Sequence, residues 1–254
     1  MTRIILNGCF GRMGKAVREL ADKNIGFEIV AGIEIAGERR GLTFPTYREF
    51  AICDMPADVI IDFSHPTALP SLLAYACDKK MPVVICTTGF TQEDISSINT
   101  ASEKIAIFKS ANMSLGINLI ANMVEKAAKL LYNSHFDIEI IEKHHNKKLD
   151  APSGTAMMLA DIINNALGGG LNYIYDRTGR RQEREPSEIG ITALRGGTIT
   201  GEHSIVFAGI NERIEFNHIA QNREVFALGA VKAADYILGK PPGLYDMQYL
   251  INMV

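Results

Sequence analysis

The sequence lacks the features that would direct it to a membrane or a nucleic acid. Its 254 residues include no apolar stretch that approaches the length of a membrane span. The formal net charge is only −3, so there is no electrostatic case for binding nucleic acid or a membrane surface. No internal repeat or low-complexity tail is present. We therefore expect no nucleic-acid partner and no membrane partner, and a small molecule as the ligand.

Cysteine is also scarce, and its placement argues against a secreted protein. The four cysteines, Cys9, Cys53, Cys77 and Cys86, form no CxxC pair and lie in apolar segments. Such cysteines are typical of reduced, buried thiols and not of a disulfide framework. No signal peptide is expected, because Arg3 is followed at once by a short strand-like run and glycines. These patterns predict a cytoplasmic protein.

The first half of the chain alternates apolar strands with helical patterns. A hydrophobic content of 47% and a charged content of 22% are ordinary for a globular protein, and the length suits one large domain or two modest ones. Strands are expected over residues 3–7, 27–34, 59–63, 83–87 and 105–109, with helices to about residue 23, over 68–79 and over 93–103. This alternation predicts right-handed βαβ units in an α/β fold, a Rossmann-like doubly wound parallel sheet.

The second half has strands that follow one another with fewer helices between them. Strands are expected over 136–143, 190–195, 204–208 and 213–218, and a helix over 153–166. This order predicts a second α+β domain with a mixed or antiparallel sheet. A helix over 116–132 leads into it, and the spacing of Leu119, Met123, Ala127 and Leu130 predicts its buried face. The charged residues 176–186 between strands are expected to form a mobile, solvated loop, and residues 226–238 a final helix.

Three glycines after the first strand indicate a dinucleotide site. Gly8, Gly11 and Gly14 can form a tight turn, let the backbone approach a pyrophosphate and open a helix whose N-terminus holds the phosphates. Glu34 lies 20 residues after Gly14, at the end of the second strand, where an acid binds the adenosine ribose. A nicotinamide dinucleotide is the expected cofactor, and a flavin stays possible on the fold alone. The loop residues expected to contact it are Gly8, Cys9, Phe10, Gly11, Arg12 and Met13.

Two later loops follow strands at the edge where an open α/β sheet binds its ligands. The first contains Cys86, Thr87 and Thr88, and the second contains Ser110, Ala111, Asn112 and Met113. Elsewhere on the sheet such segments would be ordinary polar loops with capping residues. At these positions we expect them to contribute to the cofactor site.

Residues 142–156 concentrate titratable side chains on the connection between a strand and a helix. His144 and His145 can exchange protons near neutral pH, and Lys147 and Lys148 supply positive charge or an acid. Ser153 is the expected N-cap of the helix, with Gly154 and Thr155 in the first turn, where N–H groups attract anions. This combination predicts an active site that holds carboxylates and moves protons.

A metal site is the alternative interpretation of the same stretch. His144, His145 and Asp150 are all zinc ligands by residue type. Adjacent histidines point apart on a strand or a helix, however, and no cysteine or third spaced histidine is near. Taken singly, each histidine is more commonly a surface or core residue than a catalyst. We expect no metal.

The stretch EKHHNKKLDAPSGTA, residues 142–156, resembles the signature E-x-H-H-x-x-K-x-D-A-P-S-G-T-A of the 4-hydroxy-tetrahydrodipicolinate reductase family, also called dihydrodipicolinate reductase. The resemblance extends from Gly8 to the ending GLYDM. The two loops resemble the family segments G-T-T-G-F and A-N-F-S-x-G-x-N, with Cys86 in place of Gly and Met113 in place of Phe. The resemblance implies NAD(P)H-dependent reduction of 4-hydroxy-tetrahydrodipicolinate, via dihydrodipicolinate, to tetrahydrodipicolinate in diaminopimelate and lysine biosynthesis.

The same resemblance assigns roles to residues. It makes His144 a proton donor and acceptor and Lys148 a proton donor, while His145, Gly154 and Thr155 contact substrate. It also implies a discontinuous dinucleotide domain over 1–113 and 219–254, a substrate-binding and oligomerisation domain over 114–218, and a homotetramer.

Two other functions stay open on the residues alone. Another NAD(P)-dependent dehydrogenase of amino-acid metabolism would share the glycine loop, and would typically need a nucleophilic cysteine, for which Cys86 is the candidate. A non-catalytic dinucleotide-sensing regulator would have no use for His144, His145 and Lys148 beside an anion site, and the chain has no basic DNA-reading module.

The cofactor preference is predicted from the pair Glu34-Ile35. A glutamate accepts hydrogen bonds from both ribose hydroxyls of NADH and repels the 2′-phosphate of NADPH, and Ile35 adds no compensating charge. Arg12, Arg39 and Arg40 are near enough in sequence to reach a phosphate. We expect NADH to be preferred moderately, with real NADPH activity.

Overall fold

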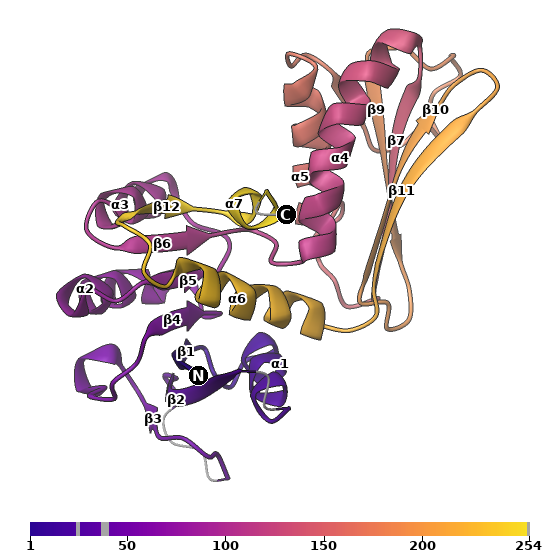
Figure 1. Cartoon of the computed structure of the whole chain (residues 1–254). Helices are drawn as coiled ribbons and strands as arrows, with labels where there is room; N and C mark the ends of the chain where they lie inside the picture. The colour runs from indigo at the N-terminus through magenta and orange to yellow at the C-terminus, as the bar shows by residue number, and fades with distance from the viewer. Residues whose placement is uncertain (24–25, 37–40, 253–254) are drawn as a thin grey trace. The chain divides into compact units, whose positions relative to one another are not determined.

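The computed structural model describes residues 1–23, 26–36 and 41–252. The chain forms two compact units, which are described separately below. The first comprises Met1–Leu115 and Arg223–Val254, and the second comprises Gly116–Asn222 (Figure 1). Among the helices of the described residues, none combines the length and apolar content needed to cross a bilayer.

A seven-stranded parallel sheet organises the first unit. Its strand order is β12-β6-β5-β4-β1-β2-β3, with every neighbouring pair parallel. The strands are β1 (Thr2–Asn7), β2 (Phe27–Ile33), β3 (Thr46–Tyr47), β4 (Val59–Asp62), β5 (Val83–Ile85), β6 (Ala106–Lys109) and β12 (Gly243–Tyr245). The predicted Rossmann-like parallel sheet is confirmed. The short strands β3 and β12 were not predicted, because two- and three-residue strands are too short to show a period.

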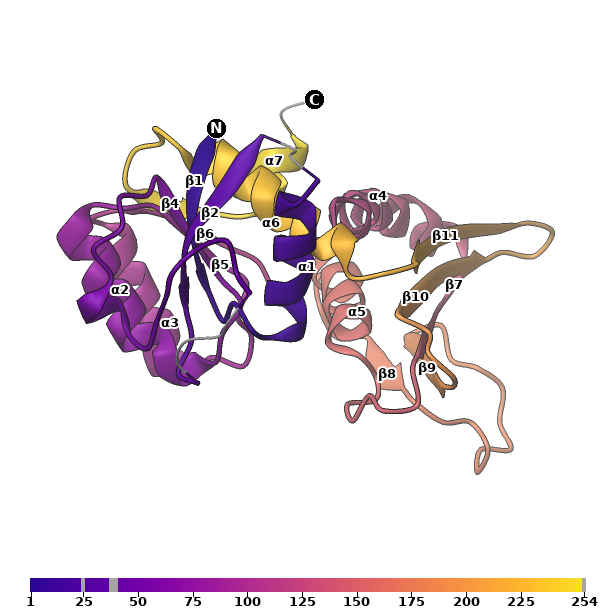
Figure 2. The same ribbon diagram turned by 90° about the horizontal axis from the view of Figure 1, so that it is seen from below.

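Helices cover both faces of this sheet, as Figure 2 shows. The helices are α1 (Arg12–Ala21), α2 (Leu69–Lys79), α3 (Gln92–Ser102), α6 (Glu224–Ile237) and α7 (Met247–Ile251), with short 3₁₀ turns η1 (Phe50–Ile52) and η2 (Pro66–Ala68). Alternate residues of one strand enter different cores, because successive side chains point to opposite faces. Ile4 and Leu6 pack with the α1 and α6 side, whereas Ile5 packs with the α2 and α3 side. Ile4, Ile5 and Leu6 in the middle of β1 are therefore all apolar and buried.

The second unit contains a mixed five-stranded sheet in the order β11-β10-β7-β9-β8. Its strands are β7 (Asp137–His144), β8 (Asn172–Ile174), β9 (Glu188–Arg195), β10 (Gly201–Ala208) and β11 (Arg213–Ala220). The central strand β7 runs parallel to β9 and antiparallel to β10. Helices α4 (Leu115–Leu131) and α5 (Gly154–Ala166) cover one face, with η3 (Tyr132–Ser134) following α4 (Figure 2). The predicted mixed sheet is confirmed.

The boundaries of the compact units differ from the expected ones. The expected change after residue 218 falls inside β11, which continues to Ala220, and the second unit ends at Asn222. The expected change after residue 113 likewise precedes the observed one, after Leu115. Strand pairing explains the first difference, because Ile219 and Ala220 are hydrogen-bonded partners of β10 and cannot leave the sheet without losing that pairing.

The predicted buried face of α4 is wrong for three of its four residues, while Ala127 packs against the core. Leu119, Met123 and Leu130 are 49%, 45% and 70% exposed. The face packed into the core is the neighbouring stripe, formed by Ile117, Ala121, Val124, Ala128 and Leu131. Both stripes have helical spacing, but Ala121 and Ala128 allow the helix to approach closely, which the larger leucines do not. Hydrophobic spacing therefore predicted the helix correctly and its orientation incorrectly.

The segment 176–186 is a largely exposed loop, as the charge pattern predicted, but arginines also anchor it to the sheet. Arg184 is mostly buried and donates to the carboxylates of Asp137 (2.7 Å) and Glu139 (3.1 Å). It also donates to the backbone carbonyls of Ile138 (3.1 Å) and Glu188 (2.5 Å). One guanidinium thus links this segment to β7 and β9, which the charge pattern alone did not indicate.

Replacing Arg184 by methionine should lower the stability of the second unit. The carbonyl oxygens of Ile138 and Glu188 would lose a charged donor, which costs about 1–3 kcal/mol when the acceptors are buried. Thermal unfolding followed by circular dichroism should show a lower Tm. Arg181→Met, at an exposed position of the same segment, is the matched control. Equal Tm values for the two variants would show that Arg184 does not hold the segment.

Candidate functional site

The glycine loop after β1 is a turn that only glycine fits. Gly8 has a φ of +75°, and a Cβ there would lie 2.5 Å from the carbonyl oxygen of Phe63. At Gly14, a Cβ would collide with the carbonyl oxygen of Gly8. The amide of Gly11 donates to that same oxygen at 3.1 Å, which closes the turn. The predicted tight turn and close helix–strand packing are therefore present.

The N-terminus of α1 and the acid that follows β2 lie at this turn. No side chain of the described residues caps α1 at its N-cap, Gly11, and both Gly11 and Arg12 are exposed. Such an N-terminus offers N–H groups and a positive dipole end to a phosphate. The carboxylate of Glu34 accepts from the amide of Phe10 at 3.1 Å, so the acid reaches the loop. These features fit the pyrophosphate and ribose of a dinucleotide.

The side chains of two predicted cofactor residues point into the protein. Cys9 is fully buried with its Sγ beside Gly32, and burial, with Glu34 adding to it, raises the pKa of the thiol to about 12. Met13 is partly buried against the core beneath α1. Only the backbone of the loop at Cys9 is therefore available to a ligand.

A cavity of about 440 Å³ adjoins the glycine loop and includes residues that the sequence did not indicate. Its lining includes Gly8, Gly11, Glu34, Arg48, His65 and Thr67. His65 and Thr67 follow β4 at the carboxyl edge of the sheet, so the rule that ligands bind at this edge could have found them. Arg48 follows the two-residue strand β3, which has no sequence signal. Arg39 and Arg40, predicted to approach a 2′-phosphate, lie outside the described residues.

The two later loops lie at the same carboxyl edge, after β5 and β6. Cys86, Thr87, Asn112 and Met113 are buried, Ser110 is half-buried, and Thr88 and Ala111 are exposed. Burial, reinforced by the nearby Asp62, raises the pKa of the Cys86 thiol well above its ordinary value. A thiol that stays protonated is a poor nucleophile, so Cys86 does not suit the chemistry of a cysteine-dependent dehydrogenase.

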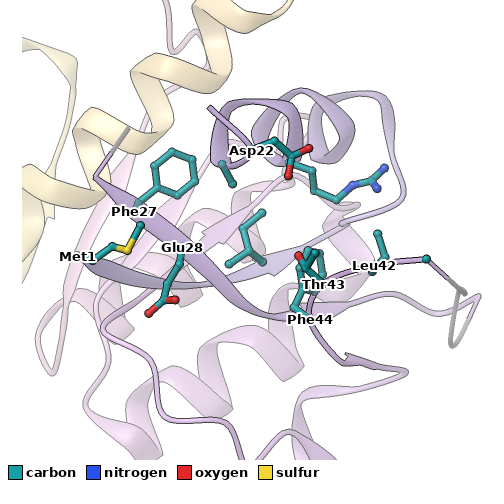
Figure 3. A pocket seen from close by; sticks show the side chains of 11 residues that line it. Met1, Asp22, Phe27, Glu28, Leu42, Thr43 and Phe44 are labelled. Atoms are coloured by element: carbon teal, nitrogen blue, oxygen red, sulfur yellow. The ribbon is translucent and has the colours of Figure 1, made fainter. Parts of the chain in front are cut away.

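A second cavity in this unit lies apart from the predicted cofactor residues. Figure 3 shows it beside the start of β2, lined by residues that include Asp22, Phe27, Glu28 and Phe44. Its walls come from the end of α1, the start of β2 and residues 41–44. None of the cofactor residues predicted from the sequence lines it, so it contributes nothing to the site described above.

In the second unit, strand β7 ends at His144, whose ring lies among the buried polar side chains of Glu142 and His203. Nδ1 of His144 lies 2.6 Å from a carboxylate oxygen of Glu142, a residue with no exposed surface. Gly201 on β10 leaves room for the ring, because a Cβ at that position would lie 3.0 Å from Nε2 of His144. His203, also on β10, packs edge-to-face at a centroid distance of 5.3 Å.

The surroundings of His144 favour its neutral form. Burial lowers the pKa of the imidazole most strongly, Glu142 raises it, and the positive charges of Lys148 and Arg195 lower it. The net shift is downward from the ordinary value of 6.5. A histidine of this kind is uncharged at neutral pH and is ready to accept a proton.

The connection after β7 carries the remaining predicted residues. The ammonium of Lys148 forms a 2.8 Å ion pair with Asp150 and is largely covered, with 22% of its side chain exposed. Hydrogen bonding and charge from Lys148 outweigh the raising effect of burial, so the pKa of Asp150 is lowered. His145 is half-buried, whereas Lys147 is exposed.

Helix α5 begins where the motif predicted. Ser153 is the N-cap, and its hydroxyl accepts from the amide of Ala156 at 3.2 Å. Gly154 is exposed and Thr155 is half-buried in the first turn. The second unit thus brings together a neutral histidine, a lysine and a helix N-terminus. Within the described ranges, no group of three His, Cys, Asp or Glu side chains is placed to hold a metal ion.

Comparison with known protein families accounts for both units. A family profile described as dihydrodipicolinate reductase, N-terminus, matches residues 2–113, and one described as dihydrodipicolinate reductase, C-terminus, matches residues 116–251. The chain belongs to the dihydrodipicolinate reductase family. Of the alternatives left open by the sequence, both the other dehydrogenase and the non-catalytic regulator are therefore set aside.

Individual members of the dihydrodipicolinate reductase family support this assignment. The chain is 51% identical to a 4-hydroxy-tetrahydrodipicolinate reductase of Caldanaerobacter subterraneus subsp. tengcongensis, over 99% of each chain. It is 47% identical to the corresponding reductase of Clostridium tetani, over 99% of this chain and 98% of that one. The solved dipicolinate-bound dihydrodipicolinate reductase of Paenisporosarcina sp. TG-14 superposes with a TM-score of 0.81 at 25% identity, covering all of both chains.

Replacing Gly8 by alanine should weaken dinucleotide binding by roughly tenfold or more, which corresponds to about 1.4 kcal/mol. The added Cβ would press on the carbonyl of Phe63 and open the turn. Gly239→Ala is the matched control, since Gly239 also has a positive φ, +71°, but no described atom lies within 4 Å of its Cβ position. Fluorescence titration with NADH measures both. Equal affinities would show that the close contact at Gly8 does not shape the cofactor site.

Proposed function

We propose that this chain reduces 4-hydroxy-tetrahydrodipicolinate, via dihydrodipicolinate, to tetrahydrodipicolinate with NAD(P)H, and that His144 and Lys148 move the protons. This is a step of diaminopimelate and lysine biosynthesis. The observation that carries the assignment of roles is that a neutral, buried His144 ends β7 and the ammonium of Lys148 follows four residues later on the connection.

The cofactor would be held in the first unit. Gly8, Gly11 and the N-terminus of α1 fit the pyrophosphate, and Glu34 fits the adenosine ribose. Thr87, Thr88 and the loop from Ser110 to Met113 are proposed to line the nicotinamide side. When bound, the nicotinamide supplies the hydride for the reduction.

The protons balance with one acid and one base. Loss of water from the hydroxylated ring needs an acid at the leaving hydroxyl and a base at the neighbouring C–H. Lys148, as an ammonium, is suited to protonate the hydroxyl, and neutral His144 is suited to take the carbon-bound proton at Nε2. After hydride addition, protonated His144 can return that proton to the ring. The sum consumes one hydride and one proton and releases one water.

The substrate is a dicarboxylate, and the second unit offers groups that suit anions. His145, Gly154 and Thr155 are proposed to contact the carboxylates, with the N-terminal end of α5 favouring negative charge. Dipicolinate, the molecule bound in the solved relative, is a planar ring with two carboxylates, as this role requires.

A homotetramer built through the second unit is part of this proposal. The face of the five-stranded sheet opposite α4 and α5 exposes Ile141 (38%), Leu194 (46%) and Ile219 (64%), which register places on one side. On this face they flank the ion pair between Lys143 and Glu202, and exposed apolar side chains beside polar ones are typical of an interface between subunits. A cytoplasmic location stays a prediction from the four thiols, which are all unpaired.

The catalytic roles predict a specific kinetic result. His144→Ala and Lys148→Ala should each lower kcat by about 10²–10⁴-fold, the usual cost of losing a positioned acid or base. The affinity for NADH should be unchanged, because both residues lie in the other unit from the glycine loop. Steady-state kinetics at the nicotinamide absorbance band, with freshly generated substrate, measures this.

Lys147→Ala is the matched control for the lysine. Lys147 is adjacent to Lys148 in sequence, carries the same charge and is exposed, so its loss should leave kcat within about twofold. Near-wild-type turnover in His144→Ala or Lys148→Ala would remove that residue from the mechanism.

The NADH preference is a separate prediction. Glu34 is held against the loop by the amide of Phe10, and Ile35 is 78% exposed without a charge to offer. Glu34→Ala should therefore lower kcat/KM for NADH more than kcat/KM for NADPH. Neutralising Arg39 and Arg40 should instead lower kcat/KM for NADPH more than for NADH. Arg48 lines the cavity beside the glycine loop together with Glu34, so Arg48→Met should also lower kcat/KM for NADPH selectively. The measurement is kcat/KM for both cofactors.

A wild type that favours NADPH by about tenfold, or 1.4 kcal/mol, would contradict the predicted preference. It would mean that the arginines outweigh the repulsion between Glu34 and a 2′-phosphate.

A further inference from the structure

A fully buried carboxylate lies behind His144. Glu142 has no exposed surface, yet it accepts four hydrogen bonds. Arg195 donates two of them, at 2.6 and 2.8 Å, the amide of Ser153 donates a third at 2.9 Å, and Nδ1 of His144 lies 2.6 Å away. A buried carboxyl without partners would take up a proton to avoid the cost of desolvation. Here the donors outweigh burial and lower the pKa of Glu142, which stays a carboxylate.

The charge on Glu142 determines which nitrogen of His144 carries the proton. An ionised carboxylate can only accept hydrogen bonds, so Nδ1 of His144 must donate to it. In the neutral ring the lone pair then lies on Nε2. This is the nitrogen beside Gly201, on the side of the ring away from Glu142.

The other polar groups around the ring cannot replace Glu142. His203 is held neutral, because burial lowers its pKa to about 3, and its Nε2 is engaged by the Ser153 hydroxyl at 3.1 Å. Lys148 and Arg195 are positive and oppose a charged imidazole. His218, opposite His203 in the β10–β11 register, also has a lowered pKa because it is buried. Asp150 is paired with Lys148.

Arg195 connects this pair to the loop that carries Lys148. Besides its two bonds to Glu142, its guanidinium donates to the backbone carbonyl of Asp150 at 2.6 Å. Asp150 in turn forms the ion pair with Lys148. The same arginine therefore holds both the carboxylate behind the histidine and the backbone beside the lysine.

We propose that Glu142, held ionised by Arg195, is a positioning residue that fixes the Nδ1–H tautomer of His144 and so presents Nε2 as the proton-accepting atom. This inference rests on the proposed role of His144 and adds the group that orients it.

Glu142→Gln is the direct test, because it keeps the shape and removes the charge. The glutamine amide can donate to Nδ1, which would move the imidazole proton to Nε2 and block proton acceptance there. A histidine in the wrong tautomer is lost as a base, so we expect kcat to fall by roughly 10²–10⁴-fold. The dissociation constant for NADH should be unchanged.

A pH profile separates positioning from simple structural support. Glu142 raises the pKa of His144 against burial and two positive charges, so its removal should move the acid limb of kcat/KM to lower pH. Glu142→Asp keeps a carboxylate and should retain the acid limb near its wild-type position while turning over more slowly. If the glutamine variant does not fold, the kcat and acid limb of Glu142→Asp still test the role of the carboxylate.

Glu188→Gln is the matched control. Glu188 is a buried carboxylate at the other end of β9, paired with Arg177 at 2.5 Å. Its replacement therefore also removes a buried charge from an arginine pair, but at a site that does not contact His144. We expect a lower Tm in both glutamine variants, but a reduced kcat and a displaced acid limb only in Glu142→Gln.

Two outcomes distinguish this inference from the proposed function. If His144→Ala loses activity while Glu142→Gln keeps the wild-type kcat and acid limb, the positioning role is wrong and the catalytic role of His144 stands. If His144→Ala turns over normally, the proposed function of that residue fails, and the inference fails with it. A kcat loss in Glu142→Gln and Glu188→Gln alike, with both acid limbs unmoved, would also overturn it.

Discussion

The burial of one ionised carboxylate is the constraint on which the second unit's site depends. Glu142 is held by Arg195 and the amide of Ser153, so β9 and the start of α5 must meet β7 at its end. A carboxylate in that position without those donors would be neutral or would expel the loop. The arrangement of β7, β9 and α5 is therefore also the arrangement that orients His144.

The first unit differs from the second, because its site for a charged ligand lies at the end of an otherwise apolar sheet. The middle of β1, β4 and β5 is apolar and buried on both faces, and the polar residues of β1 and β4 lie at the ends of those strands. The polar groups are concentrated where the strands end, at the glycine loop, Glu34 and the residues after β4. Backbone amides and a helix N-terminus then supply the positive character that a phosphate needs, without a buried cation.

The two sites differ in how far sequence reasoning could reach. The turn closed by the bond between Gly8 and Gly11 and the Ser153 N-cap of α5 depend on neighbours close in the chain, so their local geometry followed the prediction. The roles given to those residues stay predictions. Arg48, His65 and Arg195 were missed, because each reaches its site only through packing. His65 had a signal that could have been used, because it follows a predicted strand of the parallel sheet, at whose carboxyl edge ligands bind.

By itself the sequence determined the order of most strands and helices and the local turns, because these depend on periodicity and on short-range backbone geometry. It also indicated the family, through the resemblance of residues 142–156 to the family signature. The tertiary structure alone decided which apolar stripe of α4 faces the sheet, and where Arg184 is anchored. It also decided that Arg195, 53 positions from Glu142, neutralises that carboxylate. A helical period specifies that a face is apolar but not what it meets, and a charge specifies no partner until distant segments pack together.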